Sequence, residues 1–290
     1  MTFPTFVLTV SGSDSSGCAG MQADNRAIHA AGAQPLNVLT AVTLQTPDGL
    51  LETQAMPPAF VGRQMRELLK AYPVAAVKSG MLVSAAHVRE LARVLSEFPD
   101  IPYVLDPVCR SSGGQDLLDS EGIALLRETL LTRTTLITPN LEEVFALAEG
   151  DEQTDAPQTA ARLSRKSGVA VLLKGGHADG PTSDDQLYRP EREPVVFSTS
   201  RIQSRNTRGT GCALSAAIAA RLALGDELEE AIRKAKALLQ HAMCEQTAVQ
   251  WPGQGPAFNG YPPLVSVKGR PVLGEGRKTW RVDEIKLAAT

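Results

Sequence analysis

The sequence predicts an α/β fold in which a central, mostly parallel sheet has helices on both faces. Short apolar or β-branched runs recur along the chain, and each is followed by a longer stretch with helical periodicity. Small and polar residues cluster directly after these runs. The chain has 290 residues, which suits one α/β domain or two small ones with a sizeable core, and its 43% hydrophobic and 21% charged residues are ordinary for a globular protein. Such alternation favours a parallel sheet, because each helix carries the chain back across it.

The predicted elements follow one another in a regular order. The predicted strands are Phe6–Val10, Val38–Leu44, Ala75–Val77, Tyr103–Leu105, Leu136–Thr138 and Val169–Leu173. The predicted helices are Met21–Ala31, Phe60–Leu69, Ala85–Leu95, Ile123–Leu130, Leu141–Glu149 and a helix that ends with Ala161–Lys166. A hairpin of Gln186–Tyr188 with Pro194–Ser198 comes next, and then two helices, Ala213–Leu224 and Leu228–Glu245.

The composition changes near the end of the chain. Glycine, proline and charge rise after Trp251, and the periodicity fades. We therefore expect one domain over residues 1–259 and a C-terminal extension over residues 260–290, whose order is left open.

Several classes of partner and compartment are disfavoured. The formal net charge is -3 and no basic stripe is interleaved with aromatic residues, so we expect no nucleic-acid partner. No stretch approaches the ~18 apolar residues of a membrane span, and residues 1–10 do not resemble a signal peptide. Cysteines at 18, 109, 212 and 244 form neither a CxxC pair nor a zinc-spaced cluster with the histidines. A reducing, cytoplasmic location is expected.

Polar residues follow six of the predicted strands. The segments are Ser11–Asp14, Gln45–Thr46, Lys78–Met81, Asp106–Pro107, Pro139–Asn140 and Lys174–His177. The carboxyl ends of parallel strands share one edge of the sheet, where ligands bind in open α/β folds. Any one segment is as readily an ordinary turn. Six together predict a ligand site.

The segment Asn206–Ser215 places two glycines just before an apolar helix. Glycine lets the backbone approach an anion closely, and free N–H groups in the first helical turn attract negative charge. A glycine turn leading into a core helix explains the segment equally well. Other phosphate and hydrolase motifs are absent: the sequence contains no GxxxxGK[ST], GxGxxG after a strand, HExxH or GxSxG.

These motifs together resemble one family. In order they read SGSDSSGCAGMQAD, LTAVTLQ, VKSGML, VLDPV, ITPNLEE, VLLKGGH and NTRGTGCALSAAIAA, with PGQGP near Gly253. The chain resembles the ribokinase superfamily and, within it, the hydroxymethylpyrimidine/phosphomethylpyrimidine kinases of thiamine biosynthesis. The resemblance covers Phe6 to Asn259 and implies a ribokinase-like fold. Pyridoxal kinases share this fold and some of the motifs.

The resemblance implies ATP- and Mg²⁺-dependent phosphorylation of the hydroxymethyl group of 4-amino-5-hydroxymethyl-2-methylpyrimidine, and of its monophosphate, by a homodimer. It implies site residues of three kinds. Gly12, Asp24, Gln45, Met81 and Val108 would line the pyrimidine site, where Asp24 and Gln45 could read ring nitrogens. Asn140, Lys174 and Thr207 would lie near the nucleotide. Asp106 and Glu143 would organise Mg²⁺ and its waters, and Gly209, Gly211 and the Cys212 amide would form the anion hole.

Cys212 stands where most of the superfamily has aspartate as the base that accepts the hydroxyl proton. A thiol at a helix N-terminus is expected to have a lowered pKa, and its thiolate could accept that proton. The alternative is a small residue packed under the helix.

The chain departs from the family pattern at three positions. Arg208 replaces a histidine and could contact phosphate or alter access to the donor, Ser112 replaces a lysine, and Ser79 replaces a branched apolar residue. The change at Ser112 puts the second phosphorylation in more doubt than the first, and Arg110 could compensate. His177 is expected near the nucleotide or as a loop cap rather than as a base. Two other functions stay open: a pyridoxal kinase, and a pyrimidine-binding regulatory protein that has lost catalysis.

Overall fold

The computed structural model of the chain describes residues 4–46, 49–111, 113–148, 155–176, 180–258, 264–274 and 277–287, with the backbone alone for the last two ranges. The chain divides into two compact units, Met1–Asn259 and Gly260–Thr290. The domain assignment made from the sequence stays a prediction.

The larger unit is built on one sheet with strand order β3-β2-β1-β4-β5-β6-β7-β8-β9. Strands β2, β1, β4, β5, β6 and β7 pair in parallel, whereas β3, β8 and β9 pair antiparallel to their neighbours. The bounds are β1 Phe6–Asp14, β2 Gln34–Thr46, β3 Gly49–Ala55, β4 Val74–Ser79, β5 Tyr103–Leu105, β6 Leu136–Ile137, β7 Ala170–Leu173, β8 Thr182–Arg189 and β9 Arg192–Ser200. The predicted mostly parallel α/β sheet is confirmed.

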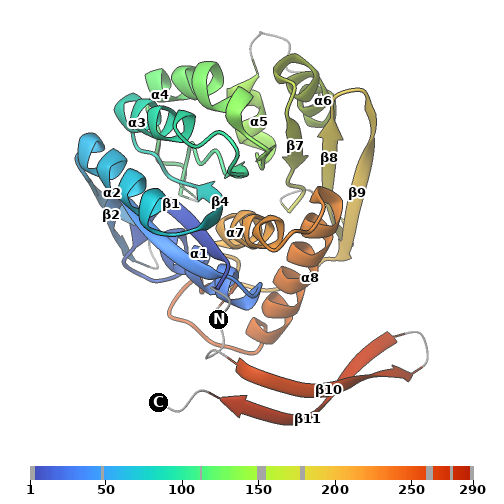
Figure 1. Ribbon diagram of the computed structural model, residues 1–290. Helices are drawn as coiled ribbons and strands as arrows, with labels where there is room; N and C mark the ends of the chain where they lie inside the picture. Colours follow the sequence, from blue (N-terminus) through green and yellow to red (C-terminus); the bar gives the residue numbers. More distant parts are fainter. Residues whose placement is uncertain are drawn as a thin grey trace. The chain divides into compact units, whose positions relative to one another are not determined.

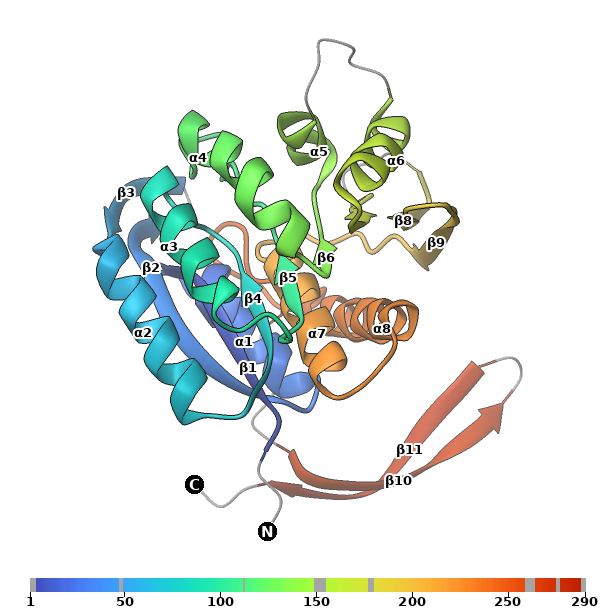
Figure 2. The ribbon, with the colours of Figure 1, turned by 45° about the horizontal axis from the view of Figure 1, so that its top comes forward.

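Helices cover both faces of this sheet (Figures 1 and 2). On one face lie α1 Gly20–Ala30, α7 Thr210–Ala223 and α8 Leu228–Gln246. On the other lie α2 Pro58–Ala71, α3 Ala85–Ser96, α4 Ser120–Leu125, α5 Leu141–Leu147 and α6 Ala156–Ser167. Helix α4 continues into a π-helical turn, Leu126–Leu130, and a 3-10 turn, Leu131–Arg133.

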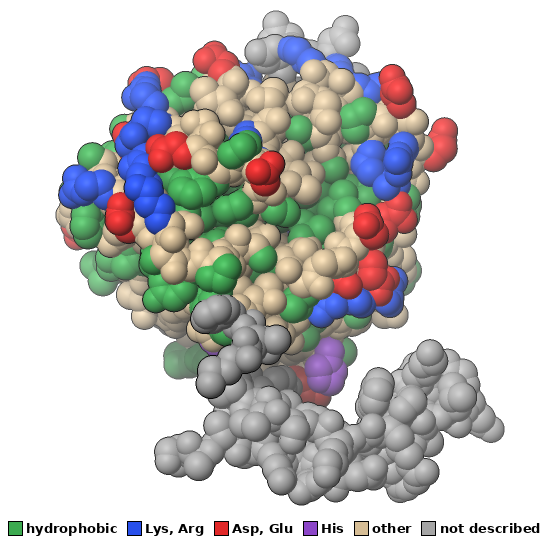
Figure 3. Space-filling view, viewed as in Figure 1, with side chains coloured by type: hydrophobic (Ala, Val, Ile, Leu, Met, Phe, Trp, Pro, Cys, Tyr) green, Lys and Arg blue, Asp and Glu red, His purple; other side chains and the backbone are tan. Residues whose placement is uncertain are grey.

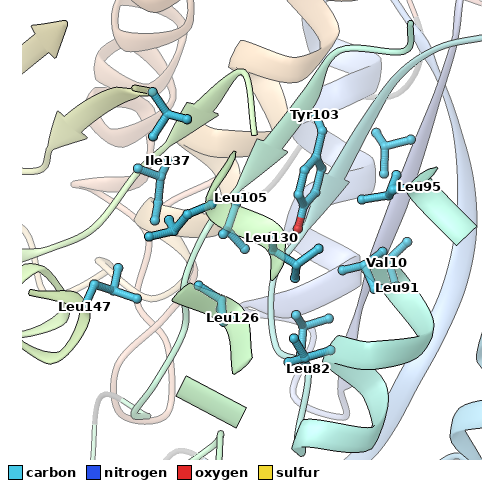
Figure 4. Close-up of a cluster of buried hydrophobic side chains, with 14 of the residues drawn as sticks. Val10, Leu82, Leu91, Leu95, Tyr103, Leu105, Leu126, Leu130, Ile137 and Leu147 are labelled. Carbon is cyan, nitrogen blue, oxygen red and sulfur yellow. The ribbon is translucent and has the colours of Figure 1, made fainter. Parts of the chain in front are cut away.

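Alternate residues of the central strands enter two different cores, as the two-residue period of a strand requires. In β1, Leu8 and Val10 join the core beneath α2 and α3, whereas Val7 joins the core beneath α1 and α7. Figure 4 shows part of the first core, where the Tyr103 ring lies among leucine side chains. The Tyr103 and Ser79 hydroxyls are 2.5 Å apart. This hydrogen bond satisfies two hydroxyl groups that are both fully buried.

Three elements differ from the prediction. Strand β3 was missed because it is an edge strand whose residues are half-buried or exposed. Strand β1 continues through Ser11–Asp14, which was expected to be a loop, because its pairing with β2 resumes beyond a register shift between Ser11 and Ser13. The C-terminal unit contains an antiparallel hairpin, β10 Leu264–Gly274 with β11 Arg277–Leu287, where no element was predicted.

On the face seen in Figure 3, acidic and basic side chains are interspersed, and lysine and arginine side chains gather at the left of the view.

Within the described part of the chain, no helix combines the length and apolar character needed to cross a membrane.

Candidate active site

The start of α7 is the centre of the candidate site. Its N-cap, Gly209, has a φ of 77°, in the left-handed region that favours glycine. A Cβ at Gly209 would also collide with the Cys18 carbonyl oxygen. Among the described residues no side chain caps this helix start. The N–H groups of the first turn are therefore placed to receive an anion.

A lysine and two carboxylates lie next to this turn. A Cβ added to Gly211 would be 3.1 Å from the Lys174 Nζ and 3.8 Å from the Asp106 Oδ2. The Lys174 Nζ is 2.7 Å from the Asp106 Oδ1 and 3.7 Å from the Glu143 Oε2. Asp106 follows β5, Glu143 lies on α5 and Lys174 follows β7. The sheet edge thus brings together four residues that were predicted to act together.

The charges of this cluster are unbalanced, because one ammonium group faces two carboxylates. Burial raises the pKa of Glu143 to about 7, and the Asp106 charge adds to that rise while Lys174 opposes it. Burial alone would raise the pKa of Asp106, but Lys174 and Lys78 outweigh it and hold that pKa below its usual value. The excess negative charge suits a cation bound between the carboxylates and a nucleotide.

The donor set fits Mg²⁺ that retains water and phosphate ligands. In the described ranges, no group of three or more His, Cys, Asp or Glu side chains could hold a metal ion by itself. Mg²⁺ is commonly bound through one or two carboxylates plus substrate phosphates. Asp106 and Glu143 supply two such oxygens, so the residues present fit the ion.

Asn140 and Thr207, both predicted to lie near the nucleotide, are half-buried. The Asn140 side chain caps α5 by accepting from the Glu142 and Glu143 N–H groups, and the Glu143 Oε2 accepts from the Asn140 N–H at 2.8 Å. This capping box orients the Glu143 carboxylate toward Lys174. The Thr207 hydroxyl accepts from the Gln254 Nε2 at 2.7 Å.

Cys212 lies in the first turn of α7 and is half-buried. Its expected low pKa is wrong for the ligand-free chain. Burial raises the pKa of the Cys212 thiol to about 11, although the Lys78 charge and the Gly20 N–H act in the opposite direction. Loss of solvent around the sulfur outweighs the favourable helix terminus, so the thiol is protonated at neutral pH.

The predicted pyrimidine-binding residues fall into two places. A Cβ on Gly12 would be 2.9 Å from the Met81 Sδ, so these two residues are in contact. The Ser15 hydroxyl bonds the backbone of Gln45 at both its N–H and its carbonyl, which places Gln45 beside the loop after β1. Val108 is half-buried, and its N–H donates to the Asp106 carbonyl at 2.9 Å, beside the lysine cluster.

Asp24 does not fit the direct ring contact that was predicted for it. The residue is fully buried, and its carboxylate accepts from the Lys78 Nζ at 2.8 and 2.9 Å. The Thr9 and Ser11 hydroxyls donate to the same carboxylate. A carboxylate this fully bonded has little capacity left to read a ligand, so Asp24 serves the wall of the site rather than its surface.

Arg208 forms a buried ion pair. It is 7% exposed, and its Nη2 lies 3.1 Å from the Asp14 Oδ2. A contact with the donor phosphate, or an effect on access to the donor, stays a prediction for this residue. Two other predictions, the departure at Ser112 and the role of His177, lie outside the described residues.

Sequence reasoning missed the partners of these groups. Lys78 was assigned to the polar edge without a role, and the Asp14–Arg208 pair joins residues 194 positions apart. Ser215, one turn inside α7, donates to the Asp106 Oδ2 at 3.3 Å. Its position three residues after Cys212, on the same helical face, was the one signal available in the sequence.

The phosphomethylpyrimidine kinase family model matches residues 14–257. A hydroxymethylpyrimidine/phosphomethylpyrimidine kinase of Synechococcus elongatus is 38% identical over 257 residues, covering 88% of this chain and 97% of that protein. The corresponding Escherichia coli kinase is 36% identical, covering 84% and 92%. A thiamine biosynthesis bifunctional protein of Geobacter sulfurreducens is 40% identical over 82% of this chain.

The chain spans about half the length of such bifunctional relatives, 49% of the Geobacter protein and 46% of an Arabidopsis thaliana one. Among solved structures, an ADP complex of Bacillus subtilis pyridoxal kinase superposes with a TM-score of 0.78 at 29% identity, covering 88% of this chain and 97% of that one. A phosphomethylpyrimidine kinase of Clostridium difficile gives 0.70 at 31% identity, covering 82% and 99%. The predicted ribokinase-like fold is confirmed, and the chain belongs to the phosphomethylpyrimidine kinase family.

Proposed function

We propose that the protein transfers the γ-phosphoryl group of ATP to the hydroxymethyl group of 4-amino-5-hydroxymethyl-2-methylpyrimidine, and to its monophosphate, in thiamine biosynthesis or salvage. The observation that carries the proposal is the uncapped start of α7 facing Lys174, Asp106 and Glu143. This arrangement offers N–H groups to a phosphoryl group and carboxylates to its metal ion. Relatives named for this activity cover most of the chain.

Each residue has a distinct task in this proposal. The Gly209–Cys212 turn binds the transferring phosphoryl oxygens through backbone N–H groups, and Lys174 adds a positive charge beside them. Asp106 and Glu143 hold Mg²⁺, which, when bound with the nucleotide, neutralises phosphate charge. Gly12 leaves room for Met81, whose side chain offers a polarisable surface to the ring. Positioning and electrostatics then supply most of the rate, since phosphoryl transfer needs little covalent help.

Cys212 takes the hydroxyl proton in this scheme, and only its minor thiolate form can do so at neutral pH. The rate with the pyrimidine alcohol should therefore keep rising with pH toward the thiol pKa of about 11. Cys212→Ala should lower turnover and flatten this profile while nucleotide affinity changes little. An unchanged profile in Cys212→Ala would reject the base assignment.

The direct test is mass spectrometry of the products formed from ATP, Mg²⁺ and each pyrimidine substrate. A product heavier by one phosphoryl group is expected from each. Failure with the monophosphate alone would limit the activity to the first step. Absence of both products, with tight pyrimidine binding, would favour a regulatory protein that has lost catalysis.

Pyridoxal phosphorylation is the second candidate. The observation in its favour is the similarity to pyridoxal kinases, 29% identical in the Bacillus subtilis case and 27% in a Staphylococcus aureus complex with AMP-PCP and pyridoxal. A substrate panel separates the two candidates. ATP consumption with pyridoxal but not with the pyrimidine alcohol would replace the first proposal by the second.

The proposed working form is a cytoplasmic homodimer. Val42, Leu44 and Leu51 on β2 and β3 are 44%, 51% and 65% exposed, beside the open edge of β3. Apolar side chains on an edge strand favour burial against a second copy of the chain. Free cysteines, two of them buried, suit a reducing compartment. Light scattering should give twice the chain mass, and Leu51→Glu should shift it toward the monomer.

A further inference from the structure

The ion pair between Arg208 and Asp14 joins the segment before α7 to the end of β1. Their side chains are 6% and 4% exposed. The Arg208 backbone is also held, because its N–H donates to the Gly255 carbonyl and its carbonyl accepts from the Ala257 N–H. The guanidinium is thus anchored at its base and directed at one carboxylate.

Asp14 is the residue around which the loop after β1 is folded. Its Oδ1 accepts from the Ser16 N–H at 2.8 Å and from the Ser16 hydroxyl at 2.7 Å. Its Oδ2 accepts from the Ala19 N–H at 2.8 Å as well as from Arg208. A second cation lies nearby, since the Arg26 Nη2 donates to the Gly17 carbonyl at 2.6 Å. Of these two cations, Arg208 is the one bonded to the Asp14 carboxylate.

This loop forms the wall of the catalytic turn. A Cβ on Gly209 would collide with the Cys18 carbonyl and lie 3.1 Å from the Ala19 Cα. The Gly20 N–H interacts with the Cys212 thiol. The position of residues 14–20 therefore sets part of the surroundings of the Cys212 sulfur, together with Lys78 and Asp24.

The same guanidinium also reaches the end of β2, because its Nη1 lies 3.4 Å from the Thr46 carbonyl oxygen. Thr46 follows Gln45, whose backbone is bonded to the Ser15 hydroxyl. The Arg208 side chain thus contacts the loop after β1 and the end of β2, and the Arg208 backbone leads directly into the Gly209–Cys212 turn.

We propose that Arg208 is a positioning residue. It holds the loop after β1 and the end of β2, on the pyrimidine side of the site, in place beside the Gly209–Cys212 turn. The inference rests on the proposed function. A shorter, uncharged side chain at this position would leave the buried Asp14 carboxylate without this bonded cation. Arginine supplies a permanent charge and several donors in a fixed plane.

The test is a double-mutant cycle with Arg208→Met, Asp14→Asn and the combined variant, measured by steady-state kinetics. Arg208→Met should raise KM for the pyrimidine alcohol and lower kcat, together by roughly 10- to 100-fold in kcat/KM, since small displacements of binding groups have effects of this size. KM for ATP should change less than about threefold, because the Lys174 cluster is untouched. Arg208→Lys should recover part of the loss, and the combined variant should be no worse than Arg208→Met alone.

Arg221 provides a matched control at the other end of α7. Its Nε is 2.5 Å from the Asp226 Oδ2, and its Nη1 lies 3.3 Å from the Ala31 carbonyl oxygen. Arg221→Met removes the same kind of pair away from the site, so both KM values should stay within about twofold of those of the unmodified chain. Equal effects of Arg208→Met and Arg221→Met, or strictly additive effects in the cycle, would overturn the proposal.

Amide hydrogen exchange supplies a readout that needs no substrate. Arg208→Met should speed exchange at Ser16 and Ala19, whose N–H groups bond Asp14, and leave β5 and β7 protected. If the unmodified chain phosphorylates no pyrimidine, this local change would show that Arg208 holds the loop after β1 through Asp14, even though the proposed function fails. Unchanged exchange at both amides would show that Arg208 does not hold this loop, whatever the activity of the chain. If Arg208→Met does not fold, Asp14→Asn and Arg208→Lys allow the same comparison.

Discussion

The Lys78–Asp24 pair and the Lys174–Asp106–Glu143 cluster both place a lysine near Cys212, and they differ in how their charges are matched. In the first, one lysine faces one carboxylate, both side chains are 0% exposed, and two hydroxyl groups complete the bonding. In the second, one lysine faces two carboxylates, and its side chain is 13% exposed.

This difference separates a structural pair from a site prepared for a ligand. A saturated pair has no free bonding capacity, so it holds α1 to β4 and supports the wall behind the site. In the unbalanced, partly open cluster the second carboxylate has a cost, because burial and the Asp106 charge raise the pKa of Glu143, and a bound cation would offset that cost. The sequence places Lys78, Asp106 and Lys174 at the same edge of the sheet, so only their partners distinguish the two roles.

The largest expected effect is on catalysis, from Lys174→Met. This variant should lower kcat by roughly 100- to 1,000-fold, the loss typical when one donor to a developing charge is removed. Its melting temperature should fall less than that of Lys78→Met, because Asp106 and Glu143 can share a proton once the lysine is gone. Lys70→Met, at an exposed lysine on α2, serves as the control. Near-normal turnover in Lys174→Met would place the site elsewhere.

Lys78→Met should have its main effect on stability. It leaves the Asp24 carboxylate buried without its cation, a change that costs about 3–5 kcal/mol of unfolding free energy. Chemical denaturation measures this loss. Adding Asp24→Leu should restore part of it, because the uncompensated charge is then removed. Wild-type stability in Lys78→Met would show that the pair is not the structural one.

A third buried lysine, Lys236, tests whether a paired lysine can affect the position of Lys174 from outside the cluster. The Lys236 Nζ is 2.5 Å from the Asp185 Oδ2, and the Asp185 Oδ1 accepts from the Gly175 N–H, directly after Lys174. Lys236→Met should raise KM for ATP by about tenfold through movement of that backbone, with little change in KM for the pyrimidine. Lys234→Met, on the same helix but paired at the surface with Asp226, should leave both values unchanged.

The limits of sequence reasoning follow the same division. The central strands and most helices could be predicted because burial imposes a period on local sequence, as in Tyr103–Leu105, whose bounds were predicted correctly. The half-exposed strand β3 carries no such period. The cluster around Lys174 could be anticipated from its motifs, since Asp106 and Lys174 each follow a strand and Glu143 opens the helix after the next one.

The pairings could not be anticipated. Asp14 with Arg208, and Asp24 with Lys78, depend on which side chains meet across elements, and no local spacing encodes that. The prediction of a low pKa for Cys212 was wrong for a related reason. The helix terminus is visible in the sequence, whereas the burial that outweighs its effect on the pKa is a property of the fold.

The smallest effect expected is a pH dependence confined to the open cluster. Burial raises the pKa of Glu143 from 4.5 to about 7, so the folded chain binds more protons than the unfolded chain between these values. The free energy of unfolding should therefore fall as pH rises from about 4.5 to 7, by an amount on the order of 1 kcal/mol, because the proton is shared with neighbouring groups. Glu143→Gln should remove this part of the slope, measured by denaturation at a series of pH values without ligand. An identical slope in both chains would mean that the two carboxylates do not compete for charge, and the contrast with the saturated Lys78–Asp24 pair would then lose its physical basis.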